Sequence, residues 1–253
     1  LKPDKEQTYA MADLWREAAR RRIIGANAVR SLARLVRGTA YMVDNRRMLR
    51  FVRAMLPPGI RTFGQLAIPL YVTLAHLRTH TLYVYGDDPT ADIAEAIVAS
   101  AAVPGFFPPL VHAGELFVDG GVVSNLPVQL AIARGATEIW AIDLANVADQ
   151  QRKPIGALRV ISMSVMPVIY NKVLHELELG LRTPGITLHH IPYYDFQNVT
   201  LGNFGLCDAM FETGKRVMQT YLANPRPNSI QYPHHLRGDE LPAGPAGTRP
   251  FIP

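Results

Sequence analysis

The chain has 253 residues, of which 48% are hydrophobic and 19% charged, so it is long enough and apolar enough for one large α/β domain or two small ones. A single cysteine excludes an internal disulfide bond, and no apolar run is long and uninterrupted enough to predict a transmembrane helix. The formal net charge is +5 and is unevenly distributed.

The first 61 residues are strongly basic: they hold 14 Lys and Arg against 5 Asp and Glu, a net charge of +9. Spacing and caps predict three helices here, at 4–22, 27–37 and 45–56. The cations either bind anionic lipid headgroups or form an ordinary solvated face. Aromatic residues do not interleave with them, so no nucleic-acid partner is expected. This stretch is also charged at its start and lacks the apolar core of a signal peptide, which favours an intracellular or peripheral-membrane location.

The middle of the chain alternates strand and helix patterns. In chain order, these patterns predict strands within 68–77 and 80–86, a helix at 90–102, a strand at 114–118, a helix at 127–134, and strands at 138–144 and 159–165. Thr90 or Asp92 is the expected cap of the first helix, and Gly135 ends the second. The last two strands are apolar runs of the type found in the buried strands of a parallel sheet.

The remainder of the chain continues this alternation and then changes character. A helix at 167–182, a strand at 186–193 and a helix at 205–222 are predicted. Residues 223–253 contain seven prolines and show no periodicity, so we predict an extended tail after a domain over 1–222. Strands that alternate with helices indicate an α/β fold with a largely parallel sheet.

The stretch FVDGGVVSNLP joins the end of a predicted strand to the start of a helix. Asp119 lies just beyond the carboxyl end of that strand, where catalytic groups gather in open α/β sheets. Gly120 and Gly121 permit positive φ angles and close backbone approach, which lets the carboxylate turn back over the sheet. Asn125 precedes the next helix, and its side chain is expected to help cap the free N–H groups there.

From these residues alone Asp119 is either a catalytic carboxylate or the first residue of a tight turn, because Asp-Gly is a common turn pair. Asp143 ends another apolar strand at the same predicted edge and is the alternative acid. The run HELEL at 175–179 lacks the second histidine of H-E-x-x-H, so no metal site is predicted. One of His189 and His190 is expected to be a hydrogen-bonded core residue.

Four features follow one another between residues 90 and 144: the helix end and loop ASAAVPGFFPP, a short strand, the DGG…N-x-P loop, and the run RGATEIWAID. Together they resemble the second half of the patatin-like acyl hydrolase domain. Weaker similarity extends upstream through TFGQLAIPLYV to LWREAARR and downstream to LGNFGLCDAMFETGKRVMQTYL, so the resemblance covers most of the chain.

The resemblance implies a three-layer α/β/α sandwich around a mainly parallel sheet, and hydrolysis of lipid acyl esters by a Ser–Asp dyad. It implies that Asp119 is the base, in a loop with Gly120, Gly121 and Asn125, that the substrate is a lipid or membrane-surface ester, and that no cofactor or metal is needed. The chemistry is coherent, because a serine hydroxyl is a weak nucleophile until an adjacent base takes its proton.

In that family the serine lies in a G-x-S-x-G elbow, and this sequence has none. Its serines are Ser31, Ser100, Ser124, Ser162, Ser164 and Ser229, and none has a glycine two residues away on both sides. No Gly-rich oxyanion loop precedes residue 13 either, so the domain over 1–222 is expected to lack its first strand, oxyanion loop and elbow. We expect a companion segment to carry the nucleophile and this chain alone to be inactive. The alternative is a catalytically inactive patatin-like module that binds lipid or protein through the basic helical region 13–61.

Overall fold

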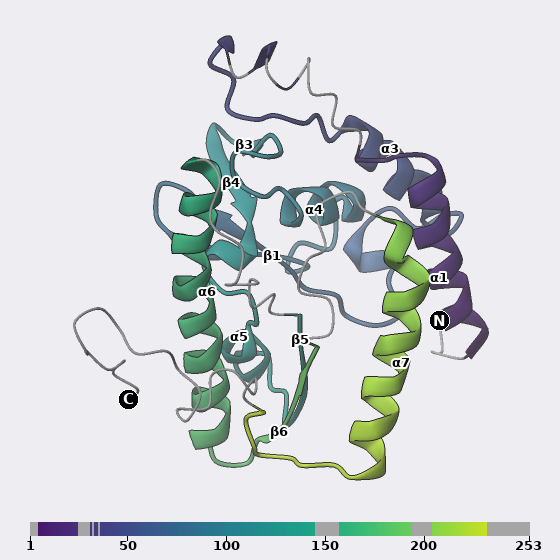
Figure 1. Cartoon of the computed structure of the whole chain (residues 1–253), viewed down its shortest axis with the longest axis vertical. Coiled ribbons are helices and arrows are strands. Elements are labelled where there is room, and N and C mark those ends of the chain that lie inside the picture. Colours follow the sequence, from purple (N-terminus) through teal and green to yellow (C-terminus); the bar gives the residue numbers. More distant parts are fainter. Residues whose placement is uncertain are drawn as a thin grey trace. The chain divides into compact units, whose positions relative to one another are not determined.

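The computed structural model describes residues 5–24, 31, 33–34, 36–144, 157–193 and 204–231. By its internal contacts the chain forms two compact units. Unit 1 consists of Leu1–Asn125 and Val199–Glu212, and unit 2 of Leu126–Asn198 and Thr213–Pro253. Figure 1 labels most of the helices and strands of both units.

Most predicted elements are found. In chain order the structure has α1 (Lys5–Arg20), α3 (Arg46–Met55), η1 (Phe63–Gln65), β1 (Val72–His76), β2 (Thr81–Tyr85), α4 (Ile93–Ser100), β3 (Leu110–His112), β4 (Glu115–Asp119), η2 (Gly120–Val122), α5 (Val128–Ala133), β5 (Glu138–Asp143), α6 (Ala157–Arg182), β6 (Thr187–Pro192), η3 (Phe204–Leu206) and α7 (Cys207–Ala223). Of the predicted helix at 27–37, residues 31, 33–34 and 36 are described and are helical, and the others before Arg37 lie outside the described residues. Strand β3 has no counterpart among the predictions.

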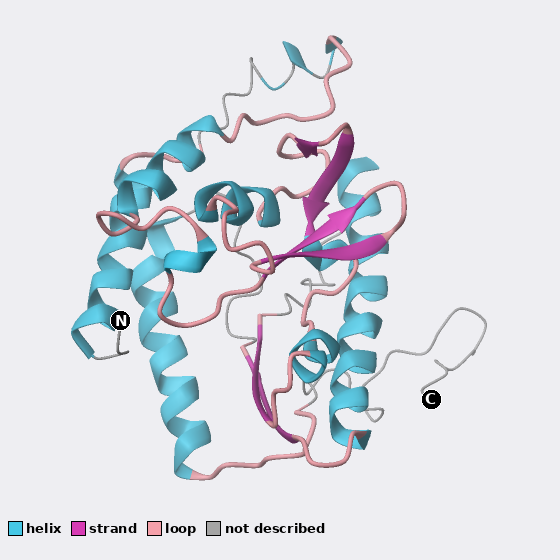
Figure 2. Cartoon of the chain, turned by 180° about the vertical axis from the view of Figure 1, so that it is seen from behind, coloured by secondary structure: helices cyan, strands magenta, loops and turns pink. Residues whose placement is uncertain are grey.

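Unit 1 contains a four-stranded sheet in the order β2-β1-β4-β3, drawn in magenta in Figure 2. Every neighbouring pair in this sheet is antiparallel, so the predicted mainly parallel sheet is not found here. The length of the connections accounts for two of these pairs: β1 and β2, and likewise β3 and β4, are joined by turns, whereas parallel neighbours need a crossover of a dozen or more residues. In the β3–β4 turn both Ala113 and Gly114 have positive φ, as a type I′ hairpin turn requires.

Helix α4 packs its apolar face against this sheet. Ala99 belongs to one buried cluster with Leu74 of β1 and Phe117 of β4. The helix begins where the Asp92 carboxylate accepts a hydrogen bond from the Glu95 N–H at 2.8 Å, so Asp92 is confirmed as its cap. The packing of Ala99 holds the last turn of α4 beside the strand that carries Asp119.

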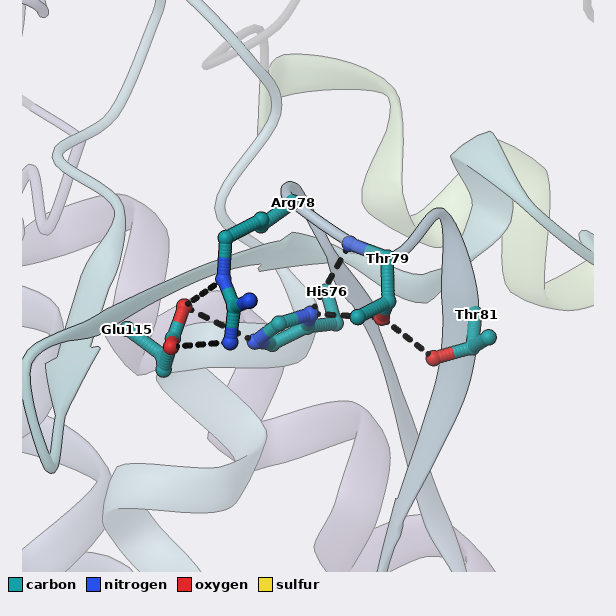
Figure 3. A network of polar contacts seen from close by, with 5 residues as sticks. All are labelled: His76, Arg78, Thr79, Thr81 and Glu115. Atoms are coloured by element: carbon teal, nitrogen blue, oxygen red, sulfur yellow. Dashed lines mark hydrogen bonds and ion pairs between the residues drawn. The ribbon is translucent and has the colours of Figure 1, made fainter.

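A polar network ties the β1–β2 turn to the start of β4 (Figure 3). His76 Nδ1 accepts a hydrogen bond from the Thr79 N–H at 3.2 Å, so we assign the ring proton to Nε2, which lies 3.3 Å from Glu115 Oε2. Arg78 donates to both oxygens of Glu115. These bonds fix the register in which Leu74 of β1 faces Asp119 of β4.

Unit 2 contains the parallel pair β5 and β6, connected by the 26-residue helix α6. The predicted strand at 159–165 is wrong, because these residues form the first part of α6. A seven-residue apolar run has no period that separates a buried strand from a helix, and here it continues through Pro167 into the helix predicted at 167–182. Val128, Leu177 and Leu188 join α5, α6 and β6 in one buried core.

Residues 228–231, near the beginning of the predicted tail, lie along β6. The Asn228 N–H donates to the Leu188 carbonyl at 2.7 Å, and Asn228 Oδ1 accepts from the Leu188 N–H at 2.9 Å. Ile230 packs against the core of unit 2. The rest of the predicted tail, residues 232–253, lies outside the described residues.

Candidate functional site

Asp119 is the last residue of β4 and begins the 3-10 turn η2. Its Oδ1 accepts a hydrogen bond from the Gly121 N–H at 2.8 Å. Its own N–H donates to the carbonyl of Ala102, just after α4, at 3.1 Å. The carboxylate is therefore held by the turn that follows β4, and its backbone by the loop that follows α4.

Gly120 and Gly121 serve this site through close packing. Neither has a positive φ angle, so that part of the expectation is wrong, whereas the expected close approach is confirmed. A Cβ on Gly120 would lie 2.5 Å from the Thr73 carbonyl oxygen of the neighbouring strand. A Cβ on Gly121 would lie 3.1 Å from Asp119 Oδ1 and 2.7 Å from Asn125 Oδ1. Only glycine allows the β1 backbone and these two side chains to come so near.

Asn125 does not cap α5, contrary to expectation. The N-cap of α5 is Pro127, which has no side-chain hydrogen bond, and the Gln129 N–H of the first turn is bound instead by Glu176 Oε2 of α6 at 2.8 Å. Glu176 is buried, and its carboxylate satisfies a donor that has no partner within the helix. Asn125 Oδ1 lies against Gly121 and is a second polar group of the Asp119 turn.

Burial raises the pKa of the Asp119 carboxyl above its ordinary value, because the ionised form loses hydration. The hydrogen bond from the Gly121 N–H opposes this effect and is the smaller influence. Once ionised, a carboxylate with a raised pKa is a stronger proton acceptor than an ordinary aspartate. The environment therefore suits Asp119 to proton transfer.

The raised pKa predicts that Asp119 costs stability at neutral pH. The folded chain holds the proton more tightly than the unfolded chain, so this cost is absent below the unfolded pKa and grows as pH rises through the folded pKa. Asn at position 119 keeps an acceptor for the Gly121 N–H and carries no charge. We expect Asp119→Asn to raise the midpoint of urea unfolding at about pH 7, and to raise it less at about pH 3.

Asp88→Asn is the matched control for this measurement. Hydrogen bonds from the side chain and backbone of Thr90 lower the pKa of the exposed Asp88, so its replacement should not stabilise the chain at neutral pH. A lower unfolding midpoint for Asp119→Asn than for the unchanged chain near neutral pH would contradict the assigned burial effect.

Asp143, the alternative acid, is engaged in a buried pair. Its side chain is almost fully enclosed at the end of β5, and Oδ2 lies 3.4 Å from His190 Nε2. His190 Nδ1 accepts a hydrogen bond from the Gln231 N–H at 3.0 Å, which assigns the ring proton to Nε2. Both nitrogens of His190 are thus used in holding the parallel strands and residue 231 together. This confirms His190 as a hydrogen-bonded core residue and favours a structural role for Asp143.

The HELEL run also has a structural role, since Glu176 binds the first turn of α5 and Lys172 lies 3.5 Å from the same carboxylate. In the part of the chain that the structure describes, no group of three or more His, Cys, Asp or Glu residues could hold a metal ion. Over the same described residues, no helix is both long enough and apolar enough to pass through a bilayer.

No described serine hydroxyl donates a hydrogen bond to Asp119. Ser31 binds the Met42 carbonyl and Ser164 the Val160 carbonyl. Among the described residues the Gly121 N–H is the single hydrogen-bond donor to the carboxylate, and it binds Oδ1. No described residue donates a hydrogen bond to the other oxygen, Oδ2.

Two residues that shape the site could not be identified from the sequence. Thr73 lies against Gly120 because β1 pairs with β4, and Ala102 binds the Asp119 N–H because α4 ends beside that strand. Ala102 is also buried in a cluster with Phe107, so the PGFFPP loop packs into the core of unit 1. The pairing of β1 with β4 joins residues more than forty positions apart, so no local sequence pattern predicts it.

Comparison with known proteins gives the family of the sequence. The sequence model of the family described as patatin-like phospholipase matches residues 1–132, just over half of the chain. Lysophospholipase NTE1 of Yarrowia lipolytica is 42% identical over 132 residues, covering 43% of this chain and 9% of that protein. Lysophospholipase NTE1 of Mycosarcoma maydis is 40% identical over 60 residues, covering 24% of this chain and 3% of that protein.

A bacterial relative covers a larger share of its own length. An uncharacterized NTE family protein of Mycobacterium tuberculosis is 25% identical over 148 residues, covering 51% of this chain and 25% of that protein. This chain thus spans a tenth or less of the fungal relatives and a quarter of the mycobacterial one.

Proposed function

The chain belongs to the patatin-like phospholipase family, and we propose that it supplies the aspartate of a Ser–Asp dyad that hydrolyses a carboxylic ester of a lipid. The observation that carries this proposal is the Asp119 turn. Its half-buried carboxylate has a raised pKa and one oxygen fixed by the Gly121 N–H, and we assign the other oxygen, Oδ2, to accept from the serine hydroxyl.

In the proposed reaction Asp119 takes the proton of the serine hydroxyl while the serine oxygen attacks the acyl carbonyl. The tetrahedral intermediate collapses, the leaving alcohol receives that proton from Asp119, and the acyl group stays on the serine. Water then attacks the acyl-serine, with Asp119 again taking a proton and returning it to the serine oxygen. Backbone N–H groups of an oxyanion loop, which we assign to the same segment as the serine, bind the oxygen that becomes negative.

We place the serine in a companion segment that is not part of these 253 residues, because none of the six serines has the G-x-S-x-G setting. The edge of strand β5 is a second argument for such a segment. This strand pairs with β6 on one side and with no other described strand on its outer side. Ile142 and Leu144, at the end of β5, are 52% and 67% exposed, and such apolar side chains are expected to be covered in a stable assembly, whereas Trp140 already stacks on His189 of β6. We call the assembly of this chain with that segment the complete enzyme.

The acyl donor that we propose is a phospholipid or a lysophospholipid. The support is chemical and comparative: the matched family is described as patatin-like phospholipases, and the fungal relatives are lysophospholipases. Such substrates present a carboxylic ester whose leaving alcohol takes its proton from Asp119 in the proposed reaction.

Hydrolysis of lysophosphatidylcholine and of a monomeric short-chain ester tests the proposal. The complete enzyme should release fatty acid from both, and this chain alone from neither. The encoded sequence upstream of Leu1, or a separately encoded partner, should contain G-x-S-x-G. Activity of the isolated chain equal to that of the complete enzyme would refute the assignment of the serine.

A further inference from the structure

Helix α3 has one face made almost entirely of arginine. Its exposed residues are Arg46, Arg47, Arg50, Arg53 and Ala54, and at 100° per residue they fall on one side of the helix. We call these four arginines the α3 arginine face. The helix contains no acidic residue, so its own side chains do not neutralise this face.

The opposite side of α3 is held in the core of unit 1. Met48 is buried in a cluster with Ala18 and Ile23 of the α1 end and Val98 of α4, and Leu49, Phe51 and Val52 pack against that cluster. The apolar side is therefore not available to enter a bilayer. Any partner of this helix must meet it through its guanidinium groups.

Half of the α3 arginine face is without carboxylate partners. Arg53 pairs with Glu95 at 2.9 Å and Asp92 at 3.2 Å, and Arg46 lies 3.7 Å from Asp44. In the part of the chain that the structure describes, Arg47 and Arg50 make no hydrogen bond or ion pair.

The end of α1 adds to this charge. Arg20 and Arg21 share the single carboxylate of Glu17, and Arg22 is exposed with no ion-pair partner among the described residues. Because Ile23 packs with Met48, this end of α1 adjoins α3. The surface formed by the two helix segments therefore carries a local excess of positive charge.

We propose that the α3 arginine face docks the protein on the anionic headgroups of a phospholipid bilayer. Several arginines on one helix side suit a surface of many phosphates, and each cation near such a surface adds to the attraction. The absence of an exposed aromatic residue on this side of α3 disfavours single-stranded nucleic acid, which needs stacking platforms. The choice of a bilayer among anionic partners rests on the proposed lipid substrate. The positive charge of the face is observed independently of that proposal.

This contact is purely electrostatic, so it differs from the insertion of an amphipathic helix. It should depend on the fraction of anionic lipid and weaken steeply as salt rises, because surface charges are screened over about 8 Å at physiological ionic strength. Docking would hold the enzyme at the interface where its ester substrate is found.

Co-sedimentation of the full chain with vesicles of ether-linked phosphatidylcholine and phosphatidylserine tests the proposal. Ether lipids have no carboxylic ester, so the measurement is independent of the Ser–Asp dyad. We expect binding to these vesicles and little to ether-linked phosphatidylcholine alone. The double variant Arg47→Gln/Arg50→Gln should bind about 30-fold more weakly, from a factor of roughly five per arginine.

The matched control is Arg182→Gln/Arg226→Gln, which removes the same charge from exposed positions in unit 2 and should bind within about threefold of the unchanged chain. Removing Arg47 takes a cation from the first turn of a helix, where cations are unfavourable, so the test variant should keep its unfolding midpoint.

Equal losses in both double variants, or equal binding to both kinds of vesicle, would overturn the proposal. Binding to duplex DNA or RNA as tight as to the vesicles, at equal phosphate concentration, would also overturn it.

If vesicle binding behaves as expected while the complete enzyme hydrolyses no monomeric ester, the proposed function fails and the docking surface stands. If the monomeric ester is hydrolysed normally and the two double variants bind vesicles alike, the docking surface fails and the dyad stands.

Discussion

Replacing Asp119 by asparagine in the complete enzyme is expected to lower kcat/KM for a monomeric ester by about two to four orders of magnitude, the usual contribution of a positioned general base. Asparagine has nearly the shape of aspartate and can still accept the hydrogen bond from the Gly121 N–H that now fixes Oδ1. It cannot take the proton of a serine hydroxyl. The loss should therefore appear in kcat with an intact fold, and the variant should unfold at higher urea concentration near neutral pH.

Asp88→Asn again supplies the control, and it should leave kcat/KM within a few-fold. If Asp119→Asn also changed kcat/KM only a few-fold, Asp119 would be a turn residue. The chain would then be a patatin-like module without catalytic function that binds lipid or protein through its basic helices. Asp119→Asn is expected to lower kcat/KM and to raise the unfolding midpoint. Unfolding of the variant would lower both quantities, so it could not produce this combination.

Replacing Gly120 by alanine is expected to lower the free energy of unfolding by roughly 3 kcal/mol, the upper end of the usual cost of overpacking. The added Cβ would lie 2.5 Å from the carbonyl oxygen of Thr73 and 2.6 Å from its hydroxyl oxygen. The first of these atoms is backbone in a paired strand, so β1 and β4 must separate to relieve the contact. Urea unfolding of the full chain measures this loss.

Gly214→Ala provides the matched control for the same substitution. Gly214 lies within α7, its φ is not positive, and a Cβ there would meet only the Tyr193 ring at 3.9 Å, an ordinary contact. Alanine should stabilise this helix by about 0.5–1 kcal/mol. A Gly120→Ala chain as stable as the unchanged one would show that β1 does not approach the Asp119 turn as the structure describes.

The sequence predicted local structure where local chemistry decides it. Asp92 opens α4 through its own carboxylate, and Gly135 ends α5 with a positive φ, so both helix boundaries were predictable. The relative direction of the strands was not predictable, because it depends on which strands pair and on which connections between them are turns. The run at 159–165 was misassigned since apolar residues suit a buried strand and a helix equally.

The candidate site was predictable in part. Asp119 and the close approach at its two glycines followed from the strand, the glycine pair and the family resemblance. The contact of Gly120 with Thr73 and the bond from Asp119 to Ala102 depend on tertiary pairing. The expected cap by Asn125 failed because a distant buried carboxylate, Glu176, satisfies α5 instead. Capping rules consider only residues near the helix end, so they could not identify Glu176, which lies 47 positions from Gln129.

Labelling with a fluorophosphonate, which reacts with activated serines, tests most directly whether Asp119 activates a serine that these 253 residues do not contain. The account predicts that the chain alone is not labelled, and that the complete enzyme is labelled at the serine of a G-x-S-x-G motif. It also predicts that Asp119→Asn slows this labelling by about two orders of magnitude or more. Labelling of any of the six serines of the isolated chain, or an unchanged labelling rate in the Asp119→Asn enzyme, would contradict it.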